Sequence, residues 1–347
     1  GENRILAYYG LKRLNEKPRK GLLSIIKICG LDKHVITIDD IVFKIGPRIN
    51  AAGRMEVDSD DENAAPSGGY SAVYLMVARD EEVASEYGAF IDTCNQDRKN
   101  IDRSITQEAH EIIESHPEMK NRKSTVIYNP KWMKGIVGIV ASRLIETYFR
   151  PTVVLTMSNG YVTGSARSVP GFDLYQAVES CSDLLENFGG HIYAAGLTMK
   201  PENVNEFMRR FNAYVEENID PEMLIPQVDI DSELLFSDIT PAFRATLNRF
   251  QPFGPENNAP VFLTRGVSNR GDARLVGAEQ EHLKMDLMQG QKPNTSIPAI
   301  AFQQPTLYEY VRSGKCIDVC YTVVENHYRG TVSPQLRIKD IKKTKIK

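Results

Sequence analysis

Two arginines flank a run of small residues in the stretch GPRINAAGRM, residues 46–55. Arg48 precedes and Arg54 follows a segment that contains Asn50 and three alanines or glycines. Guanidinium groups bind phosphate oxygens bidentately, and small side chains let a ligand approach the backbone closely. The stretch therefore predicts a place where an anionic ligand comes close to the main chain.

A second cluster, GSARS, has a cation between two hydroxyl groups. Arg167 stands between Ser165 and Ser168 at the end of an expected strand. Serine hydroxyls and backbone N–H groups donate hydrogen bonds to phosphate oxygens, and the arginine adds a charge. Taken alone, Arg167 is as readily explained as an ordinary surface charge.

A third cluster, GGHIYAAG, places an imidazole after two glycines. His191 follows Gly189 and Gly190, and it could donate a hydrogen bond to a phosphate or transfer a proton. Two simpler interpretations stay open, since a glycine pair commonly ends a helix and a lone histidine is commonly structural. The informative point is that three clusters of small residues each carry a cation or an imidazole.

The composition is that of an ordinary globular protein rather than a strongly basic one. The 347 residues are 41% hydrophobic and 25% charged, with a formal net charge of −3, which allows two or three domains and counts mildly against nucleic acid as a partner. Five cysteines without a Cys-x-x-Cys motif indicate a reducing, cytoplasmic location. No segment is long and apolar enough for a membrane helix, so we expect no membrane partner.

The helical periodicity is longest between Asp80, an expected N-cap, and Pro117. Its apolar stripe consists of Val83, Tyr87, Phe90, Cys94, Ile101, Ile105, Ala109 and Ile112, with Arg98 as the one charged position. A helix of about 35 residues would span roughly 50 Å and suits a strut between two domains.

Strand and helix patterns alternate between residues 122 and 220, which predicts an α/β domain. Strands are expected in STVIY, PTVVLTM, YVTGSARS and LTMK. One expected helix runs from an Asp173 cap to Gly189. From about residue 225, five short strands and one short helix near 240–250 predict a small β-barrel of the OB type.

These motifs, in this order, resemble the RecJ family of single-strand-specific DNA exonucleases, within the DHH/DHHA1 phosphoesterases. GPRINAAGR, GIVGIVASRL, GSARS and GGHIYAAG carry the resemblance, and FQPFGPENNAPVF and PQLRIKDI extend it to the tail. The implied organisation is a C-terminal remnant of a DHH catalytic domain at 1–66 and a long connecting helix at 67–118. A DHHA1 domain at 119–222 and an OB-like barrel at 223–347 complete it.

The resemblance implies 5′→3′ hydrolysis of single-stranded DNA in repair and recombination, with Mn²⁺ or Mg²⁺ held by the DHH domain. It implies a DNA-binding role for Arg48, Asn50, Arg54, Arg167, Ser168, Gly190 and His191, with His191 as the catalytic candidate. The residues themselves add Ser165, Gly189 and Lys134 as candidates for the same phosphate contacts. Single-stranded DNA is the expected partner of a monomer, with a helicase and a single-strand-binding protein as further partners. Phe302, His327 and Tyr328 are candidates for base stacking in the barrel.

Two features depart from the family pattern. The sequence has no Asp-x-Asp or Asp-His-His constellation, and Asp39 and Asp40 in TIDD are more simply a turn or cap. We therefore expect a fragment that holds no metal and is inactive alone. The family's Trp-His-x-Gly is also changed, because Met133 follows Trp132; Lys134 at the helix start could still meet an anion.

Two other functions remain open. The first is a DHH/DHHA1 phosphoesterase acting on short oligonucleotides or cyclic dinucleotides, which the barrel disfavours because a small nucleotide needs no platform for a strand. The second is a non-catalytic module that binds single strands.

Overall fold

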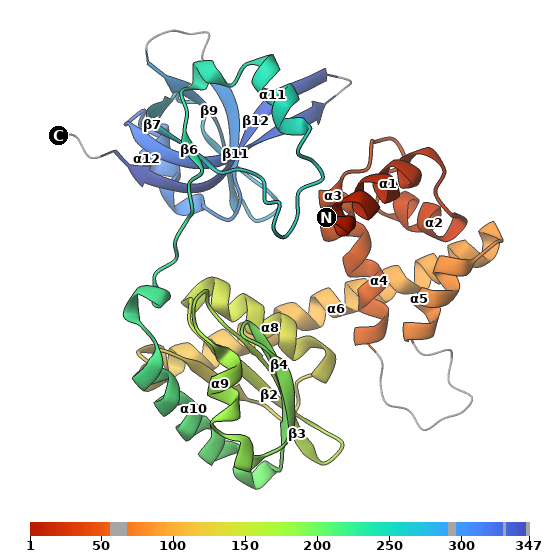
Figure 1. Cartoon of the computed structure of the whole chain (residues 1–347), viewed down its shortest axis with the longest axis vertical. Coiled ribbons are helices and arrows are strands. Elements are labelled where there is room, and N and C mark those ends of the chain that lie inside the picture. Colours follow the sequence, from red (N-terminus) through yellow and green to blue (C-terminus); the bar gives the residue numbers. More distant parts are fainter. Residues whose placement is uncertain (56–67, 291–295, 329–330, 345–347) are drawn as a thin grey trace. The chain divides into compact units, whose positions relative to one another are not determined.

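A computed structural model describes residues 1–55, 68–290, 296–328 and 331–344, without the side chains of Gly68, His327, Tyr328 and Thr331. The acidic stretch at 56–67 and the stacking candidates His327 and Tyr328 thus have no described side chains. The chain divides into two compact units, one of residues 9–226 and one of residues 227–347 with residues 1–8. Figure 1 labels the helices and strands of both units.

The α/β part of the first unit is built on a five-stranded sheet of order β1-β2-β3-β5-β4. The β1 and β2 strands are parallel, and the remaining neighbours are antiparallel. The strands are β1 (Thr125–Tyr128), β2 (Thr152–Ser158), β3 (Tyr161–Arg167), β4 (Leu185–His191) and β5 (Ala194–Met199). Its helices are α7 (Pro117–Lys120), α8 (Lys134–Tyr148), α9 (Leu174–Glu179) and α10 (Val204–Asn218).

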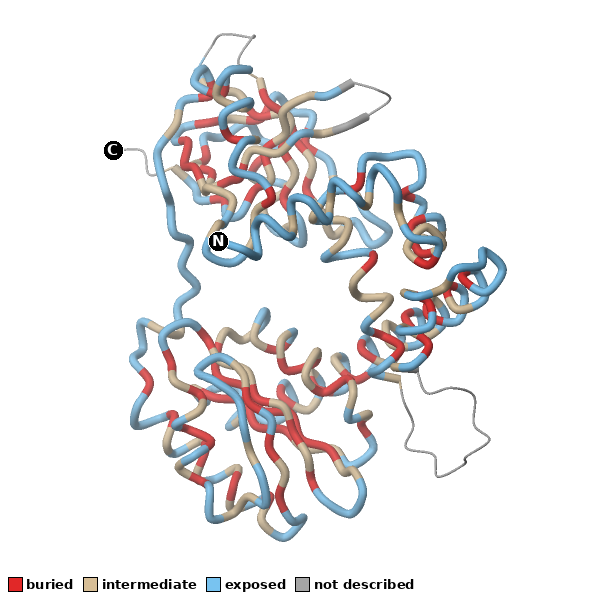
Figure 2. Tube along the Cα trace, turned by 45° about the vertical axis from the view of Figure 1, so that its right-hand side comes forward, coloured by how far each residue is buried: buried red, intermediate tan, exposed pale blue. Residues whose placement is uncertain are grey.

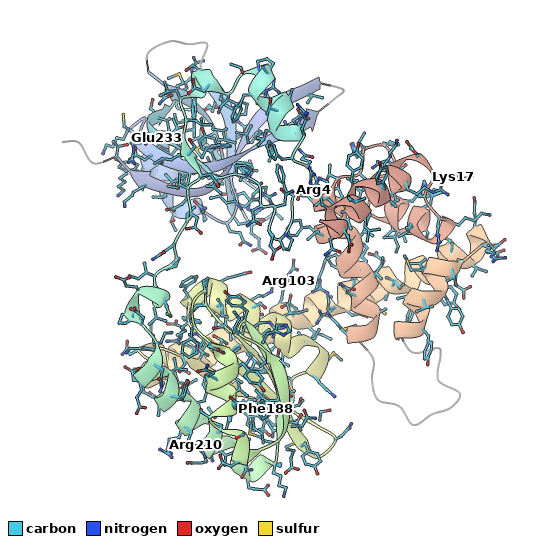
Figure 3. All side chains as sticks on the ribbon, in the orientation of Figure 1. Arg4, Lys17, Arg103, Phe188, Arg210 and Glu233 are labelled. Atoms are coloured by element: carbon cyan, nitrogen blue, oxygen red, sulfur yellow. The ribbon has the colours of Figure 1, made fainter. Side chains whose placement is uncertain are left out.

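Two apolar layers cover this sheet, and Figure 2 shows its buried strands between the helices. On one face, Val153, Leu155 and Ala166 pack with Phe207 and Phe211 of α10. On the other face, Ile127 and Val154 pack against α8 and the long helix α6 (Glu81–Ser115). Figure 3 labels Arg210 on α10 and Phe188 on β4, and Phe188 packs against the first of these layers.

The long helix is confirmed, although its buried face begins in a different register. Helix α6 has 35 residues, and Asp80 caps it by accepting hydrogen bonds from the backbone N–H groups of Glu82 and Val83. In its first half the buried positions are Ala84, Gly88, Ile91 and Asn95, whereas the predicted stripe residues Val83 and Phe90 are exposed. Small residues are preferred there because α2 (Lys20–Ile28) approaches closely: a Cβ at Gly88 would lie 2.3 Å from the hydroxyl of Ser24.

The region before α6 is helical. It contains α1 (Glu2–Glu16), α2, α3 (Ile38–Asp40), a π-helical turn (Ile41–Ile45), α4 (Gly46–Arg54) and α5 (Gly68–Val77). The expected cap in TIDD is confirmed, because Asp40 and Thr37 form a reciprocal capping box. The first arginine cluster is therefore the helix α4 itself.

The expected helix from Asp173 to Gly189 is wrong beyond its first turns. Asp173 does cap α9, but this helix ends at Glu179, and a 3₁₀ turn (Ser182–Leu184) leads into β4. Antiparallel pairing with β5 overrides the helical spacing of the leucines and Phe188. The two glycines thus lie inside a strand rather than at a helix end.

The second unit is a seven-stranded sheet of order β6-β7-β11-β12-β10-β9-β8 that closes through an additional β7–β9 pairing. Its strands are β6 (Ser232–Glu233), β7 (Phe262–Asn269), β8 (Arg274–Val276), β9 (His282–Gln289), β10 (Ser296–Ala301), β11 (Ile317–Tyr328) and β12 (Thr331–Lys343). Helices α11 (Pro241–Asn248) and α12 (Tyr308–Arg312) accompany them, and the expected barrel with a helix near 240–250 is confirmed. No helix among the described residues is long and apolar enough to cross a membrane.

Candidate nucleic-acid interface

The second and third clusters lie on one face of the sheet. Across β3, β5 and β4, Arg167 pairs with Ala194 and Ala194 pairs with His191. Directly paired residues point to the same side, so the imidazole and the guanidinium project from one face with their Cα atoms roughly 10 Å apart, two strand spacings.

The neighbouring register row supplies the small residues of that face. Ser165 of β3 pairs with Gly196 of β5, which pairs with Gly189 of β4. Ser165 lies two residues before Arg167, and Gly189 lies two residues before His191, so all four are on the same face. The residues of the opposite parity, Ala166 and Ala195, point into the apolar core. One face is thus filled by large apolar side chains, whereas this half of the other face has exposed glycines and polar groups.

Helix α8 borders this open face, and glycines make the close contact possible. A Cβ at Gly138 would lie 3.0 Å both from Nη2 of Arg167 and from Oγ of Ser165. At the start of the same helix, a Cβ at Gly135 would lie 2.1 Å from the carbonyl oxygen of Arg54, and Nη1 of Arg54 donates to the Gly135 carbonyl at 3.3 Å. Arg54 of α4 therefore lies beside the first turn of α8, near Arg167.

Arg167 is held in place without a carboxylate partner among the described residues. Its Nη1 donates to Oγ of Ser165 at 2.7 Å and to the carbonyl of Ala166 at 2.8 Å. Burial and the positive charge of Arg54 lower the pKa of Arg167. Two guanidinium groups that share a partly buried place without a counter-ion favour the binding of an anion.

The second glycine of the third cluster is required by the backbone. Gly190 has φ +153°, and a Cβ there would lie 2.2 Å from the carbonyl oxygen of Ala194. Gly189 differs, because a Cβ there would have no atom within 4 Å. The close approach of β4 to β5 thus requires a glycine at 190. At 189 the structure has room for a side chain, and glycine there leaves the face open.

The remaining predicted residues have mixed positions. The hydroxyl of Ser168 already donates to the carbonyl of Phe172 at 2.8 Å, whereas Lys134 is exposed at the first position of α8. Asn50 is exposed and lies four residues before Arg54, on the same side of α4.

Arg48, which was expected to bind DNA together with Arg54, makes its contacts elsewhere. Its Nε donates to Oδ1 of Asp92 on α6 at 2.8 Å, and its Nη1 donates to the carbonyl of Lys44. Two residues from Asn50, it falls on a different side of α4. Its charge is balanced inside the helical region.

The barrel carries its own exposed aromatic group. Phe302, at the end of β10, is 43% exposed, and its ring lies 4.9 Å from that of His282 in an edge-on arrangement. The guanidinium of Arg337 lies 5.3 Å from the centre of the same ring. An aromatic face beside a cation is the combination that holds a stacked base and its phosphate.

A row of cations continues from this ring across the outside of the barrel. Arg274, Lys284, Ile300 and Arg337 are successive partners across β8, β9, β10 and β12. Asp286, two residues further along β9 on the same side, limits the extent of the positive charge.

Comparisons with known proteins agree with both parts of the chain. The DHHA1 domain matches residues 121–217, and the RecJ OB domain matches residues 230–340. A single-stranded-DNA-specific exonuclease RecJ from Bacillus subtilis is 33% identical over 341 residues, 98% of this chain and 41% of the relative. The chain belongs to the RecJ family.

Other RecJ proteins show the same partial coverage. The RecJ of Haemophilus influenzae is 30% identical over 97% of this chain and 57% of its own length. The crystal structure of RecJ in complex with Mn²⁺ from Thermus thermophilus covers the whole chain with a TM-score of 0.79 at 25% identity. This chain spans 47% of that structure, and 41% and 57% of the two relatives.

Two RecJ structures from Thermus thermophilus are complexes with Mn²⁺ and with Mg²⁺. In the described part of this chain, no three His, Cys, Asp or Glu side chains form a group that could hold a metal ion.

Proposed function

We propose that this chain is the nucleic-acid-binding part of a RecJ-type 5′→3′ exonuclease that acts on single-stranded DNA. The observation that carries the proposal is the open face on which Ser165, Arg167 and His191 lie beside Arg54. This face offers cations, hydroxyl groups and accessible backbone, and the described residues supply no carboxylate to Arg167 or Arg54. Its chemistry suits the phosphate at the 5′ end of a strand.

Each group has a distinct task in this proposal. Arg167 and Arg54 supply charge, and Ser165 donates a hydrogen bond to the phosphate in place of its present contact. His191, two strands away from Arg167, donates a hydrogen bond to the phosphate or transfers a proton to or from it. The N-terminus of α8, with Lys134 at its first position, adds N–H groups and positive potential.

The barrel has a complementary task in the same proposal. Phe302 stacks on a base while Arg337, Lys284 and Arg274 follow the backbone of the strand. Binding of this kind has little sequence preference and weakens steeply with salt.

We also propose that the hydrolytic metal site is not formed by the described residues. The proposal predicts that this chain alone binds single strands with Mn²⁺ present and leaves them uncut. Robust cleavage of a 5′-labelled strand by the purified chain would contradict it.

The central test compares strands with a 5′-phosphate and with a 5′-hydroxyl. Arg167→Ala should abolish the preference for the phosphorylated strand and lower its affinity about tenfold, the value of a charge-assisted hydrogen bond. Arg209→Ala is the matched control, since this exposed arginine lies on α10 against the other face of the sheet. An unchanged preference in Arg167→Ala would remove this face from the function.

A phosphoesterase for short oligonucleotides is the alternative function. It would use the same phosphate-binding face and would have no use for the aromatic group and cation row of the barrel. Comparison of a dinucleotide with a long strand separates the two functions, because only the exonuclease part gains affinity from the barrel.

A further inference from the structure

A buried carboxylate on the long helix holds two arginines next to the open face. Asp102 is 1% exposed, and both of its oxygens accept from Arg143 of α8, at 2.9 and 3.1 Å from Nε and at 2.9 Å from Nη2. Arg98, one turn earlier on α6, reaches Asp102 only at 3.9 Å. The hydrogen bonds of the carboxylate thus go to Arg143, and its ion pair with Arg98 is the longer of the two.

Two hydrogen-bond donors at this place have no acceptor. Within the described part of the chain, Nδ2 of Asn95 and Nε of Arg98 are buried and unpartnered. Asn95 is completely buried, and its Oδ1 accepts from Nη2 of Arg98 at 3.3 Å. Buried donors without acceptors are destabilising, so an acceptor that enters from outside would remove a cost that the free protein carries.

The charges around these donors are unbalanced. Burial lowers the pKa of Arg98, and the positive charges of Arg143 and Arg54 lower it further against the opposing effect of Asp102. Glu146 is the other carboxylate that acts on Arg143. The positive charge of Arg54 lowers the pKa of Arg98 as well as that of Arg167, so Arg54 lies within electrostatic range of both guanidinium groups.

We propose that Arg98 and Asn95, with Arg54, form a second anion subsite that binds an internucleotide phosphate close to the 5′ end of the strand. The inference rests on the proposed function and extends it from one phosphate to two. A phosphodiester suits the place because it accepts hydrogen bonds, donates none, and carries the single negative charge that the cluster lacks. Arg143 and Asp102 act as positioning residues that hold α6 against α8.

The decisive experiment neutralises one phosphate of the ligand at a time. A 5′-phosphorylated oligothymidylate carries a single methylphosphonate at its first, second, third or sixth internucleotide linkage, and fluorescence anisotropy measures its affinity for the whole chain. One linkage among the first three should cost about tenfold, and the sixth far less. Equal losses at all four linkages would overturn the second subsite, and this scan needs no protein variant.

A protein variant then assigns the subsite to Arg98. In Arg98→Gln, a methylphosphonate at the sensitive linkage should no longer lower the affinity. The slope of log affinity against log salt concentration should fall in magnitude by about 0.7, the value of one phosphate contact. Arg98→Lys should keep the slope, and Arg209→Gln should behave as the unchanged chain. A variant that folds, as judged by the fluorescence of the single Trp132, and still responds fully to the sensitive methylphosphonate would contradict the assignment.

The two proposals fail in different ways. If the linkage scan is flat while Arg167→Ala abolishes the preference for a 5′-phosphate, only the second subsite is lost. If the 5′-phosphate preference is independent of Arg167, the proposed function itself is lost.

Discussion

In the proposed function, the sheet of the first unit and the barrel of the second offer a nucleic acid two different surfaces. The sheet presents glycines, hydroxyl groups and guanidinium groups with no large aromatic ring between Ser165 and His191. The barrel presents Phe302 between an imidazole and a guanidinium. A surface of small residues recognises charge at a defined place, whereas a ring accepts any base, so the sheet suits an end and the barrel suits a length of strand.

The difference also appears in how tightly each surface is built. On the sheet, glycine is the only residue that fits at 190, and a methyl group at 138 would contact both Arg167 and Ser165. On the barrel, Phe302 is 43% exposed. We therefore expect a substitution at Gly190 to affect folding and one at Phe302 to affect binding alone.

The largest expected effect sharpens this contrast within one strand. Gly190→Ala places a Cβ against the carbonyl of Ala194 and should lower the free energy of unfolding by about 3 kcal/mol, in the range for overpacked backbone sites. Urea denaturation followed by the fluorescence of Trp132, which is buried in the same unit, measures it. Gly189→Ala is the control, with open space at its Cβ; equal stability of the two variants would show that β4 can move away from β5.

The next effect belongs to the barrel. Phe302→Ala should lower the affinity for a long strand about tenfold through lost stacking, while affinity for a phosphorylated dinucleotide and the free energy of unfolding stay unchanged. Phe250→Ala is the control, since this ring of the same unit is also exposed. No loss of affinity for either ligand would favour the phosphoesterase for short oligonucleotides.

The smallest expected effect is that of metal removal, which should leave the affinity for single strands unchanged. If neither surface uses a metal, EDTA should leave the affinity for single strands unchanged within twofold, measured by anisotropy at constant ionic strength. A large loss of affinity on addition of EDTA, restored by Mn²⁺, would indicate a metal-dependent contact that the described residues do not explain.

The sequence predicted the position of helix α6 along the chain better than the side of this helix that is buried. Asp80 and the apolar periodicity located α6, but the buried face of its first half follows Ala84 and Gly88, whose small size permits close helix contact and whose hydrophobicity is weak. The helix expected up to Gly189 failed because Leu185 and Phe188 fit a strand of the sheet as well as they fit a helix.

The candidate site was predictable only where it coincides with local motifs. Arg167, Ser165 and His191 stand in short clusters, and strand pairing brings them to one face. The sequence gives one indication of Arg98, because it is the charged position in the apolar stripe of the long helix. Its relation to Arg143 could not be predicted, because Asp102 and Arg143 are 41 residues apart and meet through helix packing.

The segment between the two units has a quantitative consequence. Residues 225–230 are all exposed and lie outside helices and strands, so they form a short linker along the chain between the sheet and the barrel. If one surface binds a strand of DNA, the length of this linker limits the local concentration at which the other surface meets the same strand. The avidity for DNA therefore depends on the length of the linker. Inserting glycine–serine repeats there should change the avidity for long DNA and leave each intrinsic affinity alone.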